Sequence, residues 1–228
     1  MYGTLREEIE KNSAELGLDG LLALHDIISR DTDSLRRVQG IYLFSETEDN
    51  QEAVFTAAKD IRERGLDVPV FVVNDRPEDT AYKPCGFPGF IAWSRRLRDG
   101  YGIKAEPVDV IDAGRLNTFS EAQALIKFSK ENNLGSWYVV APQFHMPRAF
   151  IGAASVAIQE CSPADIFACY GPDQNWEEVI VHSQGTTKGK RRDLVKGELE
   201  RIKNYTKPGN LLLIRDVLGY VSQRQEPQ

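Results

Sequence analysis

Short apolar segments alternate with longer segments of helical spacing through the middle of the chain. The short segments are apolar on both faces, which is typical of strands buried between two layers of helices. The pattern therefore predicts strands at residues 38–44, 68–73, 107–111, 136–140 and 165–170.

The longer segments supply the crossovers that parallel strands need. They predict helices over residues 51–64, about 87–98, 117–132 and from Pro147 onward. Two further helices are expected in the first thirty residues, broken near Gly17 and Gly20, and two more at residues 191–205 and 211–223.

Together these elements predict an α/β fold that is Rossmann-like and doubly wound. Its mainly parallel sheet should have five to six strands, the sixth over residues 178–182, with extra N- and C-terminal helices. We expect a helical extension over residues 1–36, the α/β domain over 37–183, and C-terminal helices over 184–228 that pack on the same domain.

Composition narrows the classes of function. The chain of 228 residues has a formal net charge of −6 and 41% hydrophobic residues, as expected for a globular protein without a general nucleic-acid role. No apolar run is long enough to span a bilayer, and the N-terminus lacks the order of a signal peptide, so a cytoplasmic location is expected. Its three cysteines lack metal-ligand spacing, and no metal site is predicted.

Polar residues follow the predicted strands at the points where they end. In an open parallel sheet, ligands bind outside the carboxyl ends of the strands. Ser45 and Glu46 follow the first strand, Asn74 the second and Asp112 the third, and a segment with His145 and Arg148 follows the fourth. We expect these loops to converge on one crevice.

The segment with His145 and Arg148 is the leading site candidate. Pro147 favours a helix start, which puts two potential cations at the positive end of a helix dipole. That placement is favourable only if an anion or a carboxylate lies nearby. The alternatives are a histidine bonded to a neighbouring loop and a salt bridge from Arg148 to Asp112 or Glu121.

The third loop leads into a predicted helix through Asn117 and Thr118. Either residue is a common N-cap, and Glu121 lies where an acidic residue favours the first turn. Capping and ligand contact therefore both remain open for these three residues.

Other signals are weaker. The basic run at residues 188–192 is expected to be solvated, although it could reach a phosphate, and His25 and His182 are expected to be structural. The glycine-rich dinucleotide signature, the P-loop and the G-x-S-x-G elbow are all absent, so neither NAD, a P-loop nucleotide nor a hydrolase serine is indicated.

Two segments carry a family resemblance. Asp112-Ala-Gly-Arg-Leu-Asn-Thr-Phe-Ser-Glu-Ala122, followed by Val139-Val-Ala-Pro-Gln-Phe-His-Met-Pro-Arg-Ala149, resembles the paired motifs of the YdcF, SanA and ElyC family. The resemblance covers roughly residues 38–170. It implies a Rossmann-like domain of poorly defined activity, in a group linked to S-adenosylmethionine binding and, in membrane-anchored members, to cell-envelope metabolism.

The chain departs from that family pattern in its loops. The glycine-rich loop after the first strand is replaced by Phe44-Ser-Glu-Thr-Glu-Asp49, and the turn after the second strand by Val73-Asn-Asp-Arg76. In the helix motif, Asp112 replaces the usual leading Glu, and Ser120-Glu121 replaces Glu-Asn. Lost glycines remove the close backbone approach that a phosphate or nucleotide would use.

Two hypotheses follow. In the first, the sheet edge binds a small anionic or nucleotide-like ligand, either S-adenosylmethionine or a phosphorylated metabolite. Arg148 and His145 would contact the anion, and Ser45, Glu46, Asn74, Asn117, Thr118 and Glu121 would complete the site.

The sequence pairs no nucleophile with a base, so enzyme status stays open. If there is chemistry, His145 would be the acid or base, Asp112 or Glu46 would orient it or bind a metal, and phosphoryl or pyrophosphate hydrolysis or transfer is the first candidate. In the second hypothesis the site has decayed, and the protein is a non-catalytic interaction module or homodimer that uses the apolar residues 211–218. Core packing is the commoner explanation for such a face.

Overall fold

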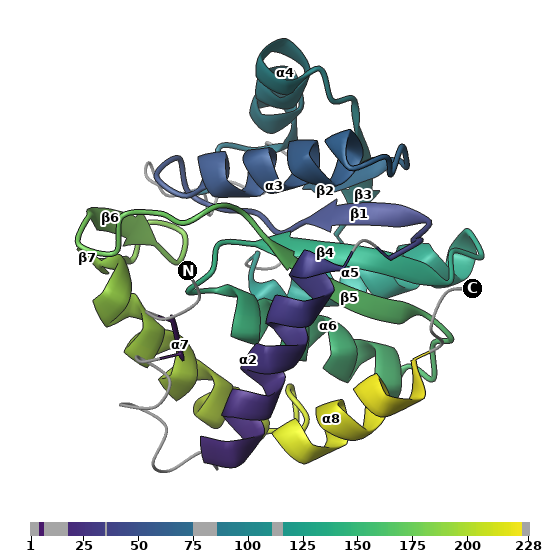
Figure 1. The fold of residues 1–228 in the computed structure, drawn as a ribbon, viewed down its shortest axis with the longest axis vertical. Coiled ribbons are helices and arrows are strands. Elements are labelled where there is room, and N and C mark those ends of the chain that lie inside the picture. The colour runs from purple at the N-terminus through teal and green to yellow at the C-terminus, as the bar shows by residue number, and fades with distance from the viewer. Residues whose placement is uncertain (1–4, 7–17, 35, 75–85, 111–115, 225–228) are drawn as a thin grey trace.

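A computed structural model gives the fold of the chain (Figure 1). It describes residues 5–6, 18–34, 36–74, 86–110 and 116–224. Two features predicted above, Asp112 and most of the first N-terminal helix, lie outside these ranges.

The core of the molecule is a five-stranded sheet in the order β3-β2-β1-β4-β5, and every neighbouring pair is parallel. Its strand residues are almost all buried, because helices cover both faces. The predicted Rossmann-like, doubly wound α/β fold is confirmed. The strands are β1 (Gly40–Leu43), β2 (Val70–Asn74), β3 (Ala105–Asp109), β4 (Ser136–Ala141) and β5 (Asp165–Tyr170).

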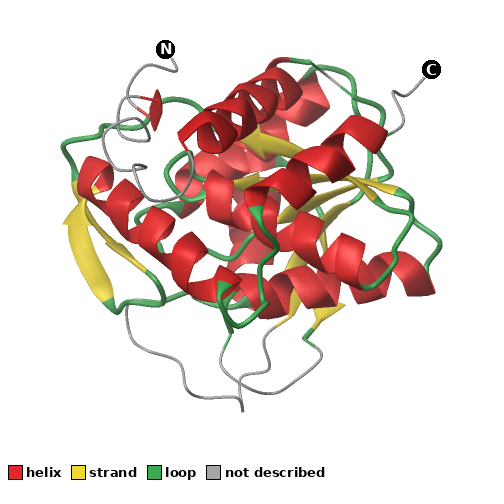
Figure 2. Cartoon of the chain, turned by 90° about the horizontal axis from the view of Figure 1, so that it is seen from below, coloured by secondary structure: helices red, strands yellow, loops and turns green. Residues whose placement is uncertain are grey.

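Four helices form the two outer layers. One pair packs on one face of the sheet and the other pair on the opposite face, as Figures 1 and 2 show. The first pair is α3 (Gln51–Glu63) and α4 (Phe90–Tyr101), and the second is α5 (Thr118–Glu131) and α6 (Met146–Gln159).

The terminal elements complete the structure. The helix α2 (Leu18–Asp33) runs unbroken through Gly20, where a break was predicted, and packs along the edge strand β5. The hairpin of β6 (Val179–His182) and β7 (Thr187–Lys190) leads directly into α7 (Arg191–Thr206), which packs on α6. The last helix is α8 (Ile214–Gln223).

The prediction that residues 178–182 add a sixth strand to the main sheet is wrong. The strand β6 does form at the predicted place, but it pairs antiparallel with β7 in a separate two-stranded sheet. A tight turn joins them, in which Ser183, Gln184 and Gly185 all have positive φ. So short a connection can join only antiparallel strands, because a parallel pair needs a long crossover.

The apolar face at residues 211–218 is largely occupied by the core. Leu211 and Val217 are buried, and α8 packs against α2 and α6. Leu213, at 44% exposure, is the exception. Core packing therefore explains most of this face, and it lends no support to the interaction-module hypothesis.

Gly171, directly after β5, allows the chain to approach α3 closely. A Cβ at this position would lie 2.0 Å from the backbone oxygen of Ala53, which cannot move aside as a flexible side chain would. Gly171→Ala should therefore destabilise the fold by about 1–3 kcal/mol in urea unfolding.

Gly219→Ala is the matched control for this substitution. Nothing lies within 4 Å of a Cβ there, and alanine favours the helical backbone of α8. It should stabilise the protein by about 0.5–1 kcal/mol. Equal effects of the two substitutions would contradict the packing argument.

Candidate functional site

The strand order reverses direction between β1 and β4, and the loops that follow these two strands lie side by side. Leu43 is paired with Val140, and the Phe44 N–H donates to the Val140 carbonyl, so both strands end at the same level. Such a switch point opens a crevice at the carboxyl edge of an α/β sheet. It carries Ser45 and Glu46 on one side and His145 on the other.

The loop after β1 is held against the β6–β7 hairpin. The Thr47 hydroxyl and the Asn50 amide both donate to the Val181 carbonyl, over 2.6 and 3.1 Å. The Val181 N–H in turn donates to the Asp49 carboxylate over 2.7 Å. These bonds fix β6, and with it His182, over the crevice.

The helix α6 begins inside the molecule. The N–H groups of His145 and Met146 both donate to the Pro142 carbonyl, and Pro147 occupies the first turn. Every residue from Met146 to Ala157 is buried, so this helix has no solvent-exposed face that could carry its polar side chains away. His145 and Arg148, at 3% and 8% exposure, are therefore held at the floor of the crevice.

Two histidines and two glutamates alternate around a closed ring, here called the His–Glu quartet: Glu46, His145, Glu198 and His182. His145 Nδ1 is hydrogen-bonded to Glu46 Oε1, and its Nε2 lies 3.9 Å from Glu198 Oε2. His182 Nε2 lies 3.1 Å from Glu198 Oε1, and its Nδ1 lies 3.5 Å from Glu46 Oε2 without hydrogen-bond geometry. All four side chains are buried.

Arg148 joins the quartet to the start of α5. Its guanidinium donates to the Glu198 carboxylate from Nε over 2.6 Å and from Nη2 over 3.4 Å. The third nitrogen, Nη1, donates to Thr118 Oγ1 over 2.5 Å. Arg201, with its side chain 28% exposed, donates to Glu198 from the rim. Glu198 therefore accepts from two arginines, and the sequence-based alternative of a salt bridge from Arg148 to Glu121 does not occur.

Glu121 is a third buried carboxyl in the site, after Glu46 and Glu198. It accepts from the Ser45 N–H over 2.8 Å and from the Ser45 hydroxyl over 2.7 Å. This pair ties α5 to the loop after β1. The hydroxyl oxygen Oγ1 of Thr118, one turn earlier on α5, lies 3.2 Å from His145 Nε2.

The pKa values of the two quartet glutamates and of Glu121 are shifted in opposite directions. Burial alone would raise the pKa of Glu46, but the charges of His145 and His182 and the hydrogen bond from His145 outweigh it and lower the pKa to about 2. Burial likewise opposes ionisation of Glu198, yet Arg148 and His182 hold its pKa well below the usual range. Burial dominates at Glu121, where it raises the pKa to about 8 although Ser45 acts against it.

The two histidines also differ. Burial lowers the pKa of His145 more than Glu46 raises it, so its imidazole is neutral near pH 7. At His182 burial is outweighed by the bonds to Glu198 and the charge of Glu46, and the pKa is raised. Two carboxyls and two imidazoles with pKa values driven apart are typical of an acid–base site, although ion-pair networks produce the same shifts.

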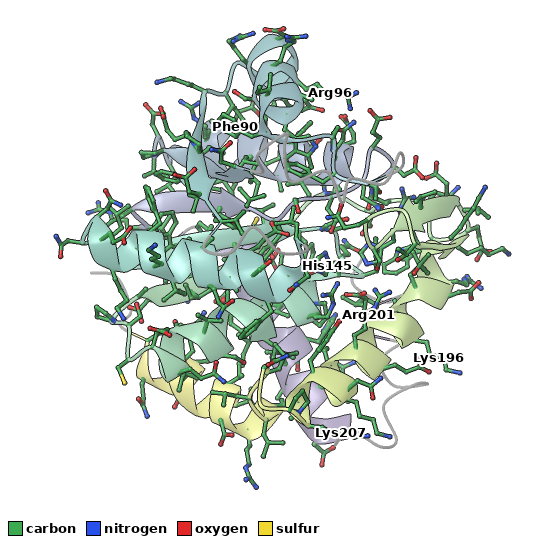
Figure 3. All side chains as sticks on the ribbon, turned by 180° about the vertical axis from the view of Figure 1, so that it is seen from behind. Phe90, Arg96, His145, Lys196, Arg201 and Lys207 are labelled. Atoms are coloured by element: carbon green, nitrogen blue, oxygen red, sulfur yellow. The ribbon has the colours of Figure 1, made fainter. Side chains whose placement is uncertain are left out.

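Of the quartet, Glu46, His145 and His182 line one open pocket with a cavity volume of about 210 Å³, and Glu198 lies behind its wall. His145 and Arg201, both labelled in Figure 3, line this pocket, and Arg201 comes from α7. The large side chains of Phe44, Tyr170 and Trp176 do not line the pocket, so none of them fills it. The lining residues are Ser45, Glu46, Thr47, Leu116, Asn117, Thr118, Glu121, His145, Arg148, His182, Ser183, Gln184, Thr186, Arg201 and Tyr205.

The structure brings most of the predicted site residues together and separates others. Seven line the pocket, whereas Asn74 lies at the end of β2, where its amide donates to Asp109 over 2.7 Å. Asn117 is exposed at the rim and caps α5 by accepting from the N–H groups of Phe119 and Ser120. The seven are Ser45, Glu46, Asn117, Thr118, Glu121, His145 and Arg148.

Sequence reasoning missed the contribution of the C-terminal part of the chain. His182 was expected to be structural, and Glu198, Arg201 and Tyr205 were not singled out. Arg201 follows the basic run at residues 188–192 that could have reached a phosphate, but it lies nine residues beyond the end of that run. No local signal marks Glu198 as part of the site, because its buried partners His182 and Arg148 lie 16 and 50 residues away in sequence.

The described part of the chain has neither a cluster of metal ligands nor a membrane-spanning helix. No group of three or more His, Cys, Asp and Glu side chains is arranged there to hold a metal ion. No helix within those ranges is long and apolar enough to cross a membrane. The chain matches no family model, no curated protein and no solved structure.

Proposed function

We propose that this chain is a YdcF-like protein that binds a small anionic ligand, a phosphorylated metabolite, in the pocket at the carboxyl edge of its sheet. The observation that carries the proposal is the convergence of two helix N-termini and two arginines on one open cavity. Thr118 begins α5 and His145 precedes α6, and Arg148 and Arg201 line the same space. The positive ends of the helix dipoles and the guanidinium groups both favour a phosphate. The first N–H groups of the two helices are already bonded to Asn117, Pro142 and His145, so the helices contribute through their dipoles.

The charge balance supports an anion. With its pKa raised to about 8 by burial, the Glu121 carboxyl is mostly neutral at pH 7 and does not repel a negative ligand. Glu46 and Glu198 are ionised, but each is already bonded to cationic or donor groups beneath the surface. Arg201 is the cation with the greatest access to solvent among these, and it faces the ligand space from the rim.

Pocket size separates the candidate ligands. Cavities for drug-sized ligands are typically about 300–1,000 Å³, and this one, at about 210 Å³, suits a phosphoryl group with a small attached part. S-adenosylmethionine is the weaker candidate, since its sulfonium is cationic and its size exceeds the enclosed space. A phosphoryl or pyrophosphate hydrolase or transferase is the first enzymatic version, and a cytoplasmic location without a nucleic-acid partner belongs to the same proposal.

Arg201→Ala should weaken the binding of inorganic phosphate about tenfold, because a charge-assisted hydrogen bond is worth about 1.5–3 kcal/mol. Binding of phosphate would be measured by calorimetry and by the rise in unfolding temperature, which follows mass action. Arg215→Ala is the matched control, since that side chain is 80% exposed on α8 and does not line the pocket. The proposal would be contradicted if phosphate did not bind the native chain, or if Arg201→Ala and Arg215→Ala bound it equally well.

A further inference from the structure

The Thr118 hydroxyl has two partners in the wall of the pocket. Arg148 Nη1 donates to Oγ1 over 2.5 Å, and His145 Nε2 lies 3.2 Å from the same oxygen. A guanidinium can only donate, so Oγ1 must be the acceptor in the first bond. The single hydroxyl proton of Thr118 is thereby left to point toward His145.

The proton on His145 is placed by its other partner. Glu46 is an ionised carboxylate, since the two histidines keep its pKa at about 2 against the effect of burial, and it can only accept. His145 Nδ1 therefore carries the proton and donates it to Glu46. Because burial lowers the pKa of His145, the ring has no second proton near pH 7. His145 Nε2 is then a free base that accepts from Thr118.

We propose that Thr118 is a nucleophile for phosphoryl transfer, with His145 as its general base and Glu46 as the positioning residue that holds the imidazole. A hydroxyl, an imidazole and a carboxylate bonded in this order are the arrangement that activates serine and threonine nucleophiles on unrelated folds. The inference rests on the proposed function, since the pocket must first bind a phosphorylated ligand. Thr118 and His145 both line that pocket.

The reaction balances with water as the only co-reactant. Oγ1 attacks the phosphorus of a phosphate ester or anhydride, its proton passes to His145 Nε2, and a new oxygen–phosphorus bond forms. The bond from phosphorus to the leaving oxygen breaks, and that oxygen takes the bonding pair and the proton from His145. Water then attacks the phosphothreonine, gives a proton through His145 to Oγ1, and releases inorganic phosphate.

The surroundings favour a phosphoryl group over an acyl group. A phosphothreonine at position 118 would lie at the first residue of α5, where the helix dipole favours negative charge, and within reach of Arg148. The Arg148 guanidinium would also stabilise the alkoxide as it forms.

An acyl-transfer site would need free backbone N–H groups around the developing oxyanion. Here the N–H groups of Phe119 and Ser120 are bonded to Asn117 Oδ1. The Glu121 N–H is bonded to the Asn117 carbonyl, and the Ser45 N–H to Glu121. The nearest backbone donors are thus already committed, which leaves the arginines as the groups that can meet the transferred charge.

The test uses acetyl phosphate and para-nitrophenyl phosphate with the full-length native chain, Thr118→Val and Thr118→Ser. Phosphate release is followed over time, and acid-quenched protein is analysed by intact mass and peptide mapping. We expect the native chain and Thr118→Ser to gain one phosphoryl group at position 118, and the rate to fall more than about a hundredfold in Thr118→Val. His145→Gln should lower the rate and remove the fall in rate that the native chain shows at acidic pH, below the ordinary histidine pKa of about 6.5, because burial lowers the pKa of His145.

Thr118→Val should fold, because the cap of α5 comes from Asn117, and circular dichroism checks this. Thr32→Val at the end of α2 is the matched control and should leave the rate unchanged. The proposal is overturned by a label that persists in Thr118→Val, by a native chain that turns over neither compound, or by Thr118-dependent cleavage of para-nitrophenyl acetate alone. If inorganic phosphate still stabilises native and Thr118→Val chains in those cases, phosphate binding stands and only the nucleophile fails.

Discussion

Glu198→Ala is expected to lower the free energy of unfolding by about 3–5 kcal/mol. The substitution removes the carboxylate that accepts from Arg148, His182 and Arg201. Arg148 is buried and always charged, so it would be left as an uncompensated charge in a medium of low dielectric, which is the costly way to break a buried ion pair. Equilibrium unfolding in urea, followed by circular dichroism, measures the loss.

Glu200→Ala is the matched control for this measurement. It removes the same type of side chain from the same helix, but Glu200 is exposed, and such surface substitutions usually change stability by about 0.5 kcal/mol or less. A loss of less than about 1 kcal/mol in Glu198→Ala would show that Arg148 finds water or another partner. The quartet would then not be the electrostatic base of the site.

The fold was predictable because its determinants are local. Strands β1, β4 and β5 are apolar on both faces, and helices such as α3 and α5 between them are amphipathic, so the parallel sheet follows from the pattern of apolar positions. The error at β6 has the same origin. The turn that joins β6 to β7 has Ser183 and Gln184 with positive φ, which is rare for residues other than glycine and gives no clear hairpin signal.

The site was predictable only where the rule for parallel sheets applies. That rule puts the ends of β1 and β4 at one edge, and it correctly brings Glu46 to His145. It says nothing of α7, which supplies Glu198 through tertiary packing. The sequence does indicate that a carboxylate or an anion should lie near His145 and Arg148, and the structure supplies two carboxylates of its own chain, Glu46 and Glu198.

Glu121→Gln is expected to remove a pH-dependent loss of stability on the order of 5 kcal/mol. Burial raises the pKa of the Glu121 carboxyl from 4.5 to about 8 in the folded protein. Between these pH values the folded chain holds a proton that the unfolded chain has released. The stability contributed by this proton is full below about pH 4.5 and is lost as pH rises through about 8. The free energy of unfolding of the native protein should therefore fall between about pH 4.5 and 8 relative to that of Glu121→Gln.

The measurement is the difference in unfolding free energy between the variant and the native chain from pH 5 to 9, in which the other titrating groups cancel. Glu131→Gln, at the exposed end of the same helix, should give a flat difference. A flat difference for Glu121→Gln would mean that Glu121 is ionised at neutral pH. The ionisation of Glu121 should also affect ligand binding. Above about pH 8 its negative charge, beside Arg148, should weaken phosphate binding in the native chain. Phosphate binding by Glu121→Gln should not change over the same range.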